Sequence, residues 1–215
     1  MKKAVRIALL HFYILISVPS MAQFESSKQI YKSSNYKEII ATHQIVAILP
    51  FKASITYKKN PKDFNAEANA NEEKKLGLNM QQGMYTYLLR KQDDYTVKLQ
   101  DVDRTNAMLK NANIYDKLDE ILADSICKIL NVDAVIRCKY DYEKTSSESG
   151  AIVKALLIGT AKTGSGSLVM QINDKKNGDL VWRFYKEMNE SIYSSSNEIM
   201  ERMMSKVGRN FPYKK

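Results

Sequence analysis

The side chains that could carry nucleophilic or acid–base chemistry are few in this sequence and lie far apart. After the first 22 residues the chain has one histidine, His43, and two cysteines, Cys127 and Cys138. A Ser-His-Asp or Cys-His arrangement would have to use His43 as its base, and we expect this residue at the surface or at a strand edge. The sequence therefore predicts no catalytic residues and a protein that is not an enzyme.

Metal and phosphate sites are not indicated either. Zinc needs three or four ligands at motif spacing, which His43 and the two cysteines lack. Asp101 and Asp103 lack the spaced ligands and the distal glutamate of a calcium loop, so we expect one or the other to cap a helix. Residues 159–167 are rich in glycine but do not end in Gly-Lys-Ser/Thr, and we interpret them as a flexible hinge. We expect no metal and no cofactor.

The first 22 residues are typical of a secretory signal peptide. Three basic residues precede an apolar run at 7–18, and a small-x-small pattern ends at Ala22. A transmembrane helix needs roughly 20 apolar residues, so this run is too short to span a bilayer; a retained membrane anchor is the alternative. No cysteine lies at the cleavage site. We expect an exported protein in the periplasm or at the outer-membrane periphery, and not a lipoprotein.

The charge of the mature chain points to no nucleic-acid partner. Cleavage would leave 215 − 22 = 193 residues, enough for one domain, and a net charge of 30 − 24 = +6. The basic residues lie in separate pairs, which is typical of a solvated surface; affinity for an anionic surface is the alternative. Export also argues against binding of nucleic acid.

The two cysteines would meet an oxidising compartment, which invites a disulfide. In a helix predicted over 115–130, the apolar positions leave Cys127 nearly opposite the buried face. Cys138 alternates with Arg137 and Lys139 in a predicted strand and should point toward the core. We therefore favour two unpaired thiols over a disulfide.

Hydrophobic periodicity predicts the elements that position these residues. Residues 23–43 are polar and predict a leader with at most one helical turn. A continuous apolar run at 45–49 predicts a strand buried on both faces, and 52–75 predicts a long exposed loop. The other predicted elements are helices at 76–88, after 101–103, at 115–130 and at 193–207, strands at 95–99 and 133–138, and a hairpin of 168–172 with 180–184 around Asn177-Gly178.

The segment 151–161 is apolar and lies between two loops. Helix-favouring residues incline it toward a helix, although a strand is also compatible with the pattern. We hypothesise that it binds a partner, because an exposed apolar patch on a small domain commonly marks an interaction site. Its apolar residues are Ile152, Val153, Leu156, Leu157 and Ile158. The alternative is an ordinary strand or a core-covering helix, in which case the tyrosine-bearing strand ends are the next candidates.

Together the elements predict an α/β (α+β) fold with a mixed β-sheet covered by helices. Their order is β-α-β-α-α-β, the apolar insert, then β-β-α, and they form a single domain at 44–213. The first and third strands follow each other across helices, so we expect them to be parallel. The hairpin adds antiparallel strands.

This order resembles the N-terminal domain of TolB and the related folds of the curli-secretion lipoprotein CsgG and the penicillin-binding-protein activator LpoB. The matching stretches are residues 46–51, 130–136 and 174–182. The chain is also similar to a set of uncharacterised exported envelope proteins through residues 100–106, 178–182 and 211–213.

The resemblance implies a TolB-N-like, non-catalytic domain that docks onto an envelope protein as an accessory module. The chain has no lipidated cysteine and no recognisable propeller or pore-forming segment, so the specific activities of those proteins are not implied. The alternative function is binding of a small ligand, glycan or lipid at the periplasm or cell surface. Self-association and peripheral association with the outer membrane are both compatible with this interpretation.

Overall fold

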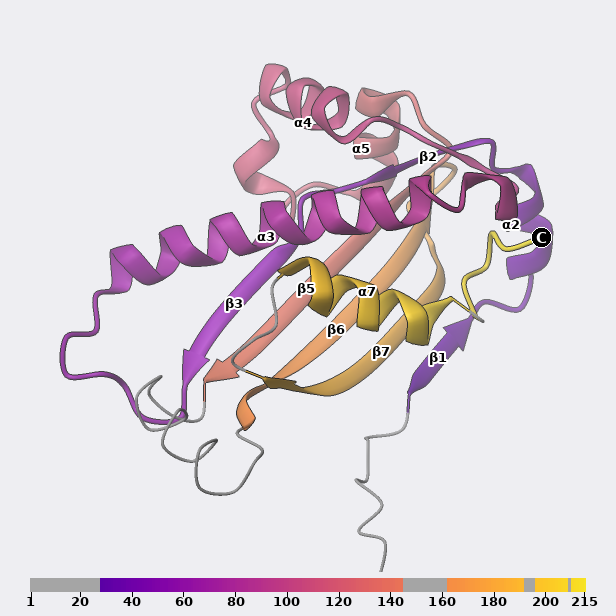
Figure 1. Cartoon of the computed structure of the whole chain (residues 1–215). Helices are drawn as coiled ribbons and strands as arrows, with labels where there is room; N and C mark the ends of the chain where they lie inside the picture. The colour runs from indigo at the N-terminus through magenta and orange to yellow at the C-terminus, as the bar shows by residue number, and fades with distance from the viewer. Residues whose placement is uncertain (1–27, 145–161, 192–195, 209) are drawn as a thin grey trace, which may run out of the picture.

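The computed structural model describes residues 28–144, 162–191, 196–208 and 210–215. Seven strands form one mixed sheet in the order β1-β7-β6-β5-β2-β4, and β3 pairs with the far part of β5. The fold confirms the prediction of a mixed sheet covered by helices (Figure 1). The strands are β1 (Gln29–Lys32), β2 (Ile45–Ile48), β3 (Lys52–Tyr57), β4 (Lys98–Leu99), β5 (Ala134–Lys144), β6 (Lys162–Asp174) and β7 (Leu180–Ser191). The helices are α2 (Tyr36–Thr42), α3 (Ala66–Leu89), α4 (Val102–Asn111), α5 (Ala123–Leu130) and α7 (Ser196–Val207), with short 3-10 turns at Gln92–Asp94 and Tyr115–Lys117.

Strands β2 and β3 both run parallel to β5 and act as one bent strand beside it. Ile48 lies opposite Ile136, and Lys52 lies opposite Lys139, so four steps along one strand match three along the other. This mismatch is a β-bulge. It falls at Pro50, which has no N–H to donate to a neighbouring strand. The predicted parallel pairing of the strands at 45–49 and 133–138 is confirmed.

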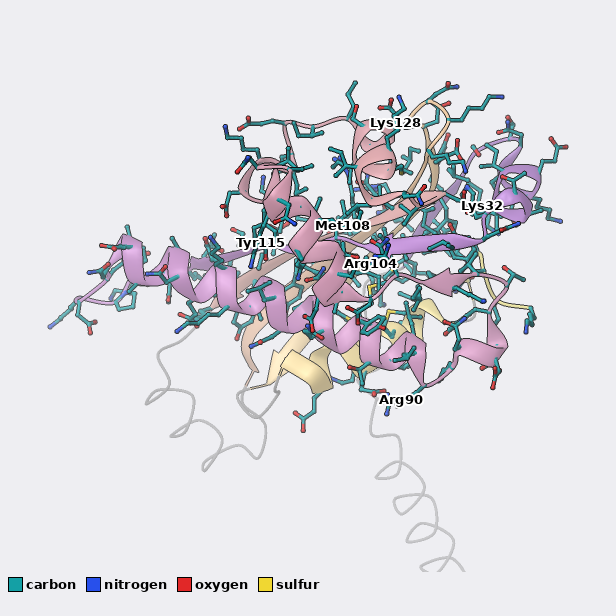
Figure 2. The ribbon with its side chains drawn as sticks, turned by 90° about the horizontal axis from the view of Figure 1, so that it is seen from above. Lys32, Arg90, Arg104, Met108, Tyr115 and Lys128 are labelled. Carbon is teal, nitrogen blue, oxygen red and sulfur yellow. The ribbon has the colours of Figure 1, made fainter. Side chains whose placement is uncertain are left out.

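The two faces of the sheet are covered unequally. Helices α3 and α7 run across one face, in front in Figure 1, and bury the larger core, which includes Trp182 and Tyr140. On the second face, α4 and α5 cover only the part near β2, where Leu109 and Ile126 belong to a smaller core with Val135. Figure 2 shows these two helices on the side opposite α7. The remainder of the second face carries the candidate site described below.

Turn and cap residues behave as the sequence predicts. The side chain of Asp101 accepts a hydrogen bond from the Arg104 N–H at the start of α4. Asn131 ends α5 with φ 52°, and Gly178 has φ 74° in the turn between β6 and β7. Asparagine and glycine tolerate this left-handed conformation better than other residues. The Asp101 cap, the helix end and the Asn-Gly hairpin are confirmed.

The N-terminal boundary of the domain differs from the prediction. Instead of a leader over 23–43, Gln29–Lys32 pairs antiparallel with β7, and α2 buries Ile40 against the sheet. Within β1 only Ile30 packs against the core, so four residues give no clear alternation of apolar and polar side chains. Residues 29–42 therefore belong to the domain that the sequence analysis begins at 44.

The predicted exposed loop over 52–75 is wrong, because it contains β3 and the first part of α3. Only Ile55 is fully buried in β3. Its N–H donates to Glu73 Oε1 at 2.8 Å, and Asn69 Nδ2 donates to its carbonyl oxygen at 3.1 Å. Polar side chains of α3 thus hydrogen-bond to backbone groups of β3, an edge strand, that face away from β5. Such cover protects an edge from pairing with another chain.

The predicted helix over 115–130 is broken, and its buried face differs from the prediction. After a 3-10 turn at Tyr115–Lys117, α5 begins only at Ala123. The break leaves Leu122 74% exposed and turns Cys127 into the smaller core, so the prediction that Cys127 points outward is wrong. Both thiols are free, and Cys138 packs in the larger core on the other face of the sheet. The sheet between them prevents the close Cα approach that a disulfide requires.

The predicted glycine hinge at 159–167 is corrected from Lys162 onward, where the chain forms β6. Gly164 and Gly166 lie beside the rings of Tyr142 and Tyr140. A Cβ atom on Gly166 would come within 2.5 Å of the Tyr140 hydroxyl oxygen. These glycines leave space for the aromatic rings on the neighbouring strand. They do not form a hinge in the backbone.

Candidate functional site: an open sheet face and a buried histidine cluster

Part of the second sheet face is left uncovered by α4 and α5, and we call it the open face. It is formed by the outward side chains of β1, β7, β6, β5 and β3. Burial alternates along these strands: Cys138, Leu168 and Met170 are buried, while Lys139 and Val169 reach solvent. This period of two is typical of a sheet that packs on one side and meets water on the other. Among the described residues, no helix lies over the open face beyond Arg137.

Strand register sorts the open face into four rows, each named after its β5 residue. The Arg137 row continues through Gln171, Arg183 and Tyr31, and the Lys139 row contains Lys52, Val169, Tyr185 and Gln29. The Asp141 row contains Ser54, Ser167 and Glu187, and the Glu143 row contains Thr56 and Ser165. Tyrosine and arginine are enriched at protein interfaces, and serine and glutamine add hydrogen-bonding groups. The rows therefore offer a mixed polar surface, with Tyr31 and Tyr185 on the two strands at one edge.

The border between the open face and the α4–α5 layer is held by basic residues. Arg137 Nη2 donates to the Ile121 carbonyl oxygen at 2.7 Å, and Lys52 pairs with Asp119. Within the face, Lys139 and Asp141 form an ion pair at 3.1 Å, with side chains 49% and 41% exposed. An ion pair this exposed contributes little to folding stability, so both charges are available to another molecule.

The histidine considered above for chemistry lies in a buried cluster at the end of the sheet. Asp174 Oδ1 is 2.9 Å from His43 Nε2, and the Tyr213 hydroxyl oxygen is 2.8 Å from His43 Nδ1. The second carboxylate oxygen of Asp174 accepts from the Lys176 N–H at 2.7 Å. The cluster joins the chain just before β2, the last residue of β6 and the C-terminal segment.

The cluster is closed to solvent and suits the joining of elements better than catalysis. His43 is 4% exposed and Tyr213 is fully buried, so the expectation of a surface or edge histidine is wrong. Burial raises the pKa of Tyr213 well above its usual range. Burial, together with the nearby negative charge of Asp174, raises the pKa of the Cys127 thiol to about 12. A thiol with so high a pKa is protonated at neutral pH and is a poor nucleophile.

Asp133 forms a second polar joint close to this cluster. Its Oδ2 accepts from the N–H groups of Gln44 and Ile45, at 2.8 and 3.0 Å, and its Oδ1 pairs with Lys175. Desolvation raises the pKa of Asp133, but the hydrogen bonds from Lys175, Ile45 and Gln44 outweigh it and lower the pKa to about 2. The carboxylate therefore ties β2, β5 and the β6–β7 turn together.

The residues that the sequence analysis assigns to partner binding are not placed by the structure. Ile152, Val153, Leu156, Leu157 and Ile158 lie outside the described residues, as does the signal peptide at 1–22. Of the tyrosine-bearing strand ends, Tyr185 lies on the open face, while Tyr140 is buried in the core. The sequence shows that Ser165, Ser167, Val169 and Gln171 alternate with buried residues and so share one face of β6. That β1 and β3 extend the same face can be seen only in the tertiary structure.

Two further observations concern the described part of the chain. There, no three His, Cys, Asp or Glu side chains gather in a way that could hold a metal ion. Among the same residues, each helix is too short or too polar to cross a bilayer.

Comparison with known proteins finds similar architectures only. No protein-family model and no curated protein matches this chain. Lipoprotein GNA1162 from Neisseria meningitidis is similar in structure, with 12% identity over 78% of this chain and 97% of that chain and a TM-score of 0.48. The PelC dodecamer from Paraburkholderia phytofirmans shows 9% identity over 88% of this chain and 99% of that chain, with a TM-score of 0.45.

LpoB, one of the proteins that the sequence resembles, is also among the similar structures. Its C-terminal domain from Salmonella enterica shows 10% identity over 69% of this chain and 84% of that chain, with a TM-score of 0.36. At such low identities and TM-scores, these similarities assign neither a function nor a location to the chain.

Proposed function

We propose that this chain is an exported, non-catalytic accessory protein that acts by binding another protein chain through the open face. The observation that carries this proposal is the open face itself: within the described residues, five strands present a surface of tyrosine, arginine, other charged and small polar side chains that no helix covers. Of these, tyrosine and arginine are the residue types that are enriched at protein interfaces. Export rests on the signal peptide expected at 1–22, which gives the open face access to partners in the cell envelope.

A structural role for the histidine cluster supports the non-catalytic part of the proposal. His43 makes a hydrogen bond with each ring nitrogen to a buried side chain and is only 4% exposed, so this imidazole lacks the contact with solvent that a substrate would need. The Cys127 thiol nearby is held in its protonated form by burial. The groups best suited to chemistry are thus engaged in holding strands and the C-terminal segment together.

Site-specific crosslinking in the producing cells tests the proposal. A photoreactive amino acid at Val169, in the middle of the open face, should capture a protein partner in intact cells. The matched control is the same amino acid at Leu122, which is exposed but lies in the loop before α5. Capture at Val169 alone supports the proposal.

A second variant connects the captured partner with the open face. Replacing Arg183 by Ala should reduce capture at Val169 severalfold, because arginine side chains are frequent energetic anchors of interfaces. Far-UV circular dichroism checks that the variant stays folded. Equal capture at Val169 and Leu122, or no protein captured from either position, would contradict binding through this face. A small molecule that copurifies with the chain would favour the alternative of a ligand carrier.

A further inference from the structure

The charged residues of the open face are sorted along the strand direction. The Arg137 row carries Arg183 as well, and the Lys139 row carries Lys52. On the other side, the Asp141 row carries Glu187, and the Glu143 row adds one more carboxylate. One half of the face is therefore basic and the other half acidic, and the boundary runs between Lys139 and Asp141 across the strands.

A surface with one basic half and one acidic half is electrostatically complementary to a second copy of itself. Two identical faces can meet around a twofold axis that lies in the interface, runs across the strands and passes between the Lys139 and Asp141 rows. This rotation places the basic half of each copy on the acidic half of the other. A parallel arrangement would instead set basic rows on basic rows, which opposes association. The charge pattern thus favours one orientation of two copies.

We propose that the open face binds the open face of a second copy of this chain, in this antiparallel twofold arrangement. The proposal rests on the proposed function and names the partner. Across the interface, Lys139 of each copy faces Asp141 of the other. Tyr185 faces Glu187, a carboxylate with which it already makes a hydrogen bond inside one chain.

The residues at the centre of the face fit close packing of two sheets. Val169 is the apolar residue of the Lys139 row, and Ser167 next to it on β6 is small. Two twisted sheets pack about 10 Å apart with strands at about −30°, which small central side chains permit. The outer rows then supply the ion pairs around this centre.

The size of the face sets the expected strength. Strands lie about 4.8 Å apart and residues on one face about 6.7 Å apart, so each residue covers about 32 Å² and the residues of the four rows together cover roughly 500 Å² per copy. Contacts of this size belong to weak and transient association. We therefore expect a dissociation constant in the micromolar range that rises with salt concentration, because the pairs at the interface are exposed ions.

A charge exchange tests the pairing, with sedimentation velocity of the mature chain as the measurement. Lys139→Glu alone sets acidic residues against acidic ones, and Asp141→Lys alone sets basic against basic; each should weaken dimerisation by about tenfold or more. An equimolar mixture of the two variants should restore a dimer that contains one of each. The double variant Lys139→Glu/Asp141→Lys should dimerise by itself.

The matched control is Lys128→Glu, which makes the same change of charge at an exposed ion pair on α5, away from the open face. It should leave the dissociation constant within about twofold of the original, because long-range charge effects are screened by salt. A chain that stays monomeric at 200 μM, or single variants that dimerise as well as the original, would overturn the proposal. The same holds if mixing the two variants restores no dimer.

The two proposals fail in different ways. If the chain is monomeric but the probe at Val169 still captures a different protein, the open face is a docking site and the second copy is the wrong partner. If the probe captures no protein chain at all while the chain remains folded, the proposed function itself is wrong. Crosslinked copies of the chain, with molecular mass twice that of one chain, support both.

Discussion

The hydrogen bonds of His43 indicate a structural role for this residue. A carboxylate can only accept, so Nε2 of His43 donates to Asp174, and Nδ1 forms its hydrogen bond with the Tyr213 hydroxyl. All three side chains are buried or nearly so, which makes each of these bonds expensive to lose. These hydrogen bonds therefore hold the C-terminal segment against the sheet, and we call His43, Asp174 and Tyr213 together the latch.

Removal of one hydroxyl tests the latch. Tyr213→Phe keeps the buried ring but leaves Nδ1 of His43 without its hydrogen-bond partner, and should lower the free energy of unfolding by about 1–3 kcal/mol. Urea denaturation of the purified protein measures this change. Tyr31→Phe is the matched control, because Tyr31 is 51% exposed and should change stability by less than about 0.5 kcal/mol. Equal stability of the two variants would show that the latch contributes nothing.

The lowered pKa of Asp133 should make the free energy of unfolding depend on pH in the acidic range. Its pKa is lowered to about 2 in the folded protein, below the unfolded value of 3.8. The stabilisation is therefore present above the unfolded pKa and is lost as the pH falls through the folded pKa. A shift of this size corresponds to roughly 2 kcal/mol.

Asp133→Asn should remove most of this stabilisation at pH 7, because the amide is a weaker acceptor for Lys175 and for two backbone N–H groups. Between pH 4 and pH 2 the difference from the original chain should shrink. Chemical denaturation at several pH values measures both curves. A difference that stays constant down to pH 2 would refute the role assigned to the carboxylate.

At the scale of the elements, the β5–β6 pair depends on glycine residues under aromatic rings. Gly166→Ala would place a Cβ atom against the Tyr140 ring, which is buried in the core and cannot move away freely. We expect a loss of about 1–3 kcal/mol in unfolding free energy, as for other overpacked sites. Ser165→Ala, which changes an exposed neighbour on the same strand, should have little effect. Thermal unfolding followed by circular dichroism distinguishes the two.

The elements that the sequence predicts well are those whose residues follow one period without interruption. The run at 45–49, the strand at 133–138 and the Asn-Gly hairpin were of this kind, and the structure confirms them. β3 could not be predicted because only one of its residues, Ile55, is buried, which leaves no alternating pattern. The polar groups of α3 that hydrogen-bond to its backbone are distant in the sequence pattern. α5 was assigned the wrong phase because Leu122 interrupts the helix and turns outward.

The candidate site was predictable only in part, for a similar reason. Its alternating residues on β6 can be recognised in the sequence, whereas its rows arise from the register of five strands that are distant along the chain. The other candidate, the apolar segment at 151–161, remains a prediction. The histidine cluster was missed because its members lie 131 and 170 residues apart, and no local pattern joins them.

At the scale of the whole molecule, the first prediction concerns export. Cleavage after Ala22 should produce a mature chain that begins at Gln23, because the residues before it follow the small-x-small pattern. Intact-mass spectrometry of the protein recovered from outside the cytoplasm measures this directly, allowing for cyclisation of the N-terminal glutamine. Recovery of a chain that retains Met1 would point to the membrane-anchor alternative.

The pairing of β1 with β7 has a consequence for when this protein can fold. Lys32 lies opposite Trp182, which comes 182 − 32 = 150 residues later, and His43 meets Tyr213 170 residues later. Contacts across so much chain are slow to form, because closing a long loop costs entropy before any contact repays it. A chain that is secreted with its N-terminus first thus carries an incomplete sheet throughout its passage. Under the proposed export, this topology delays folding until the last residues have crossed the membrane.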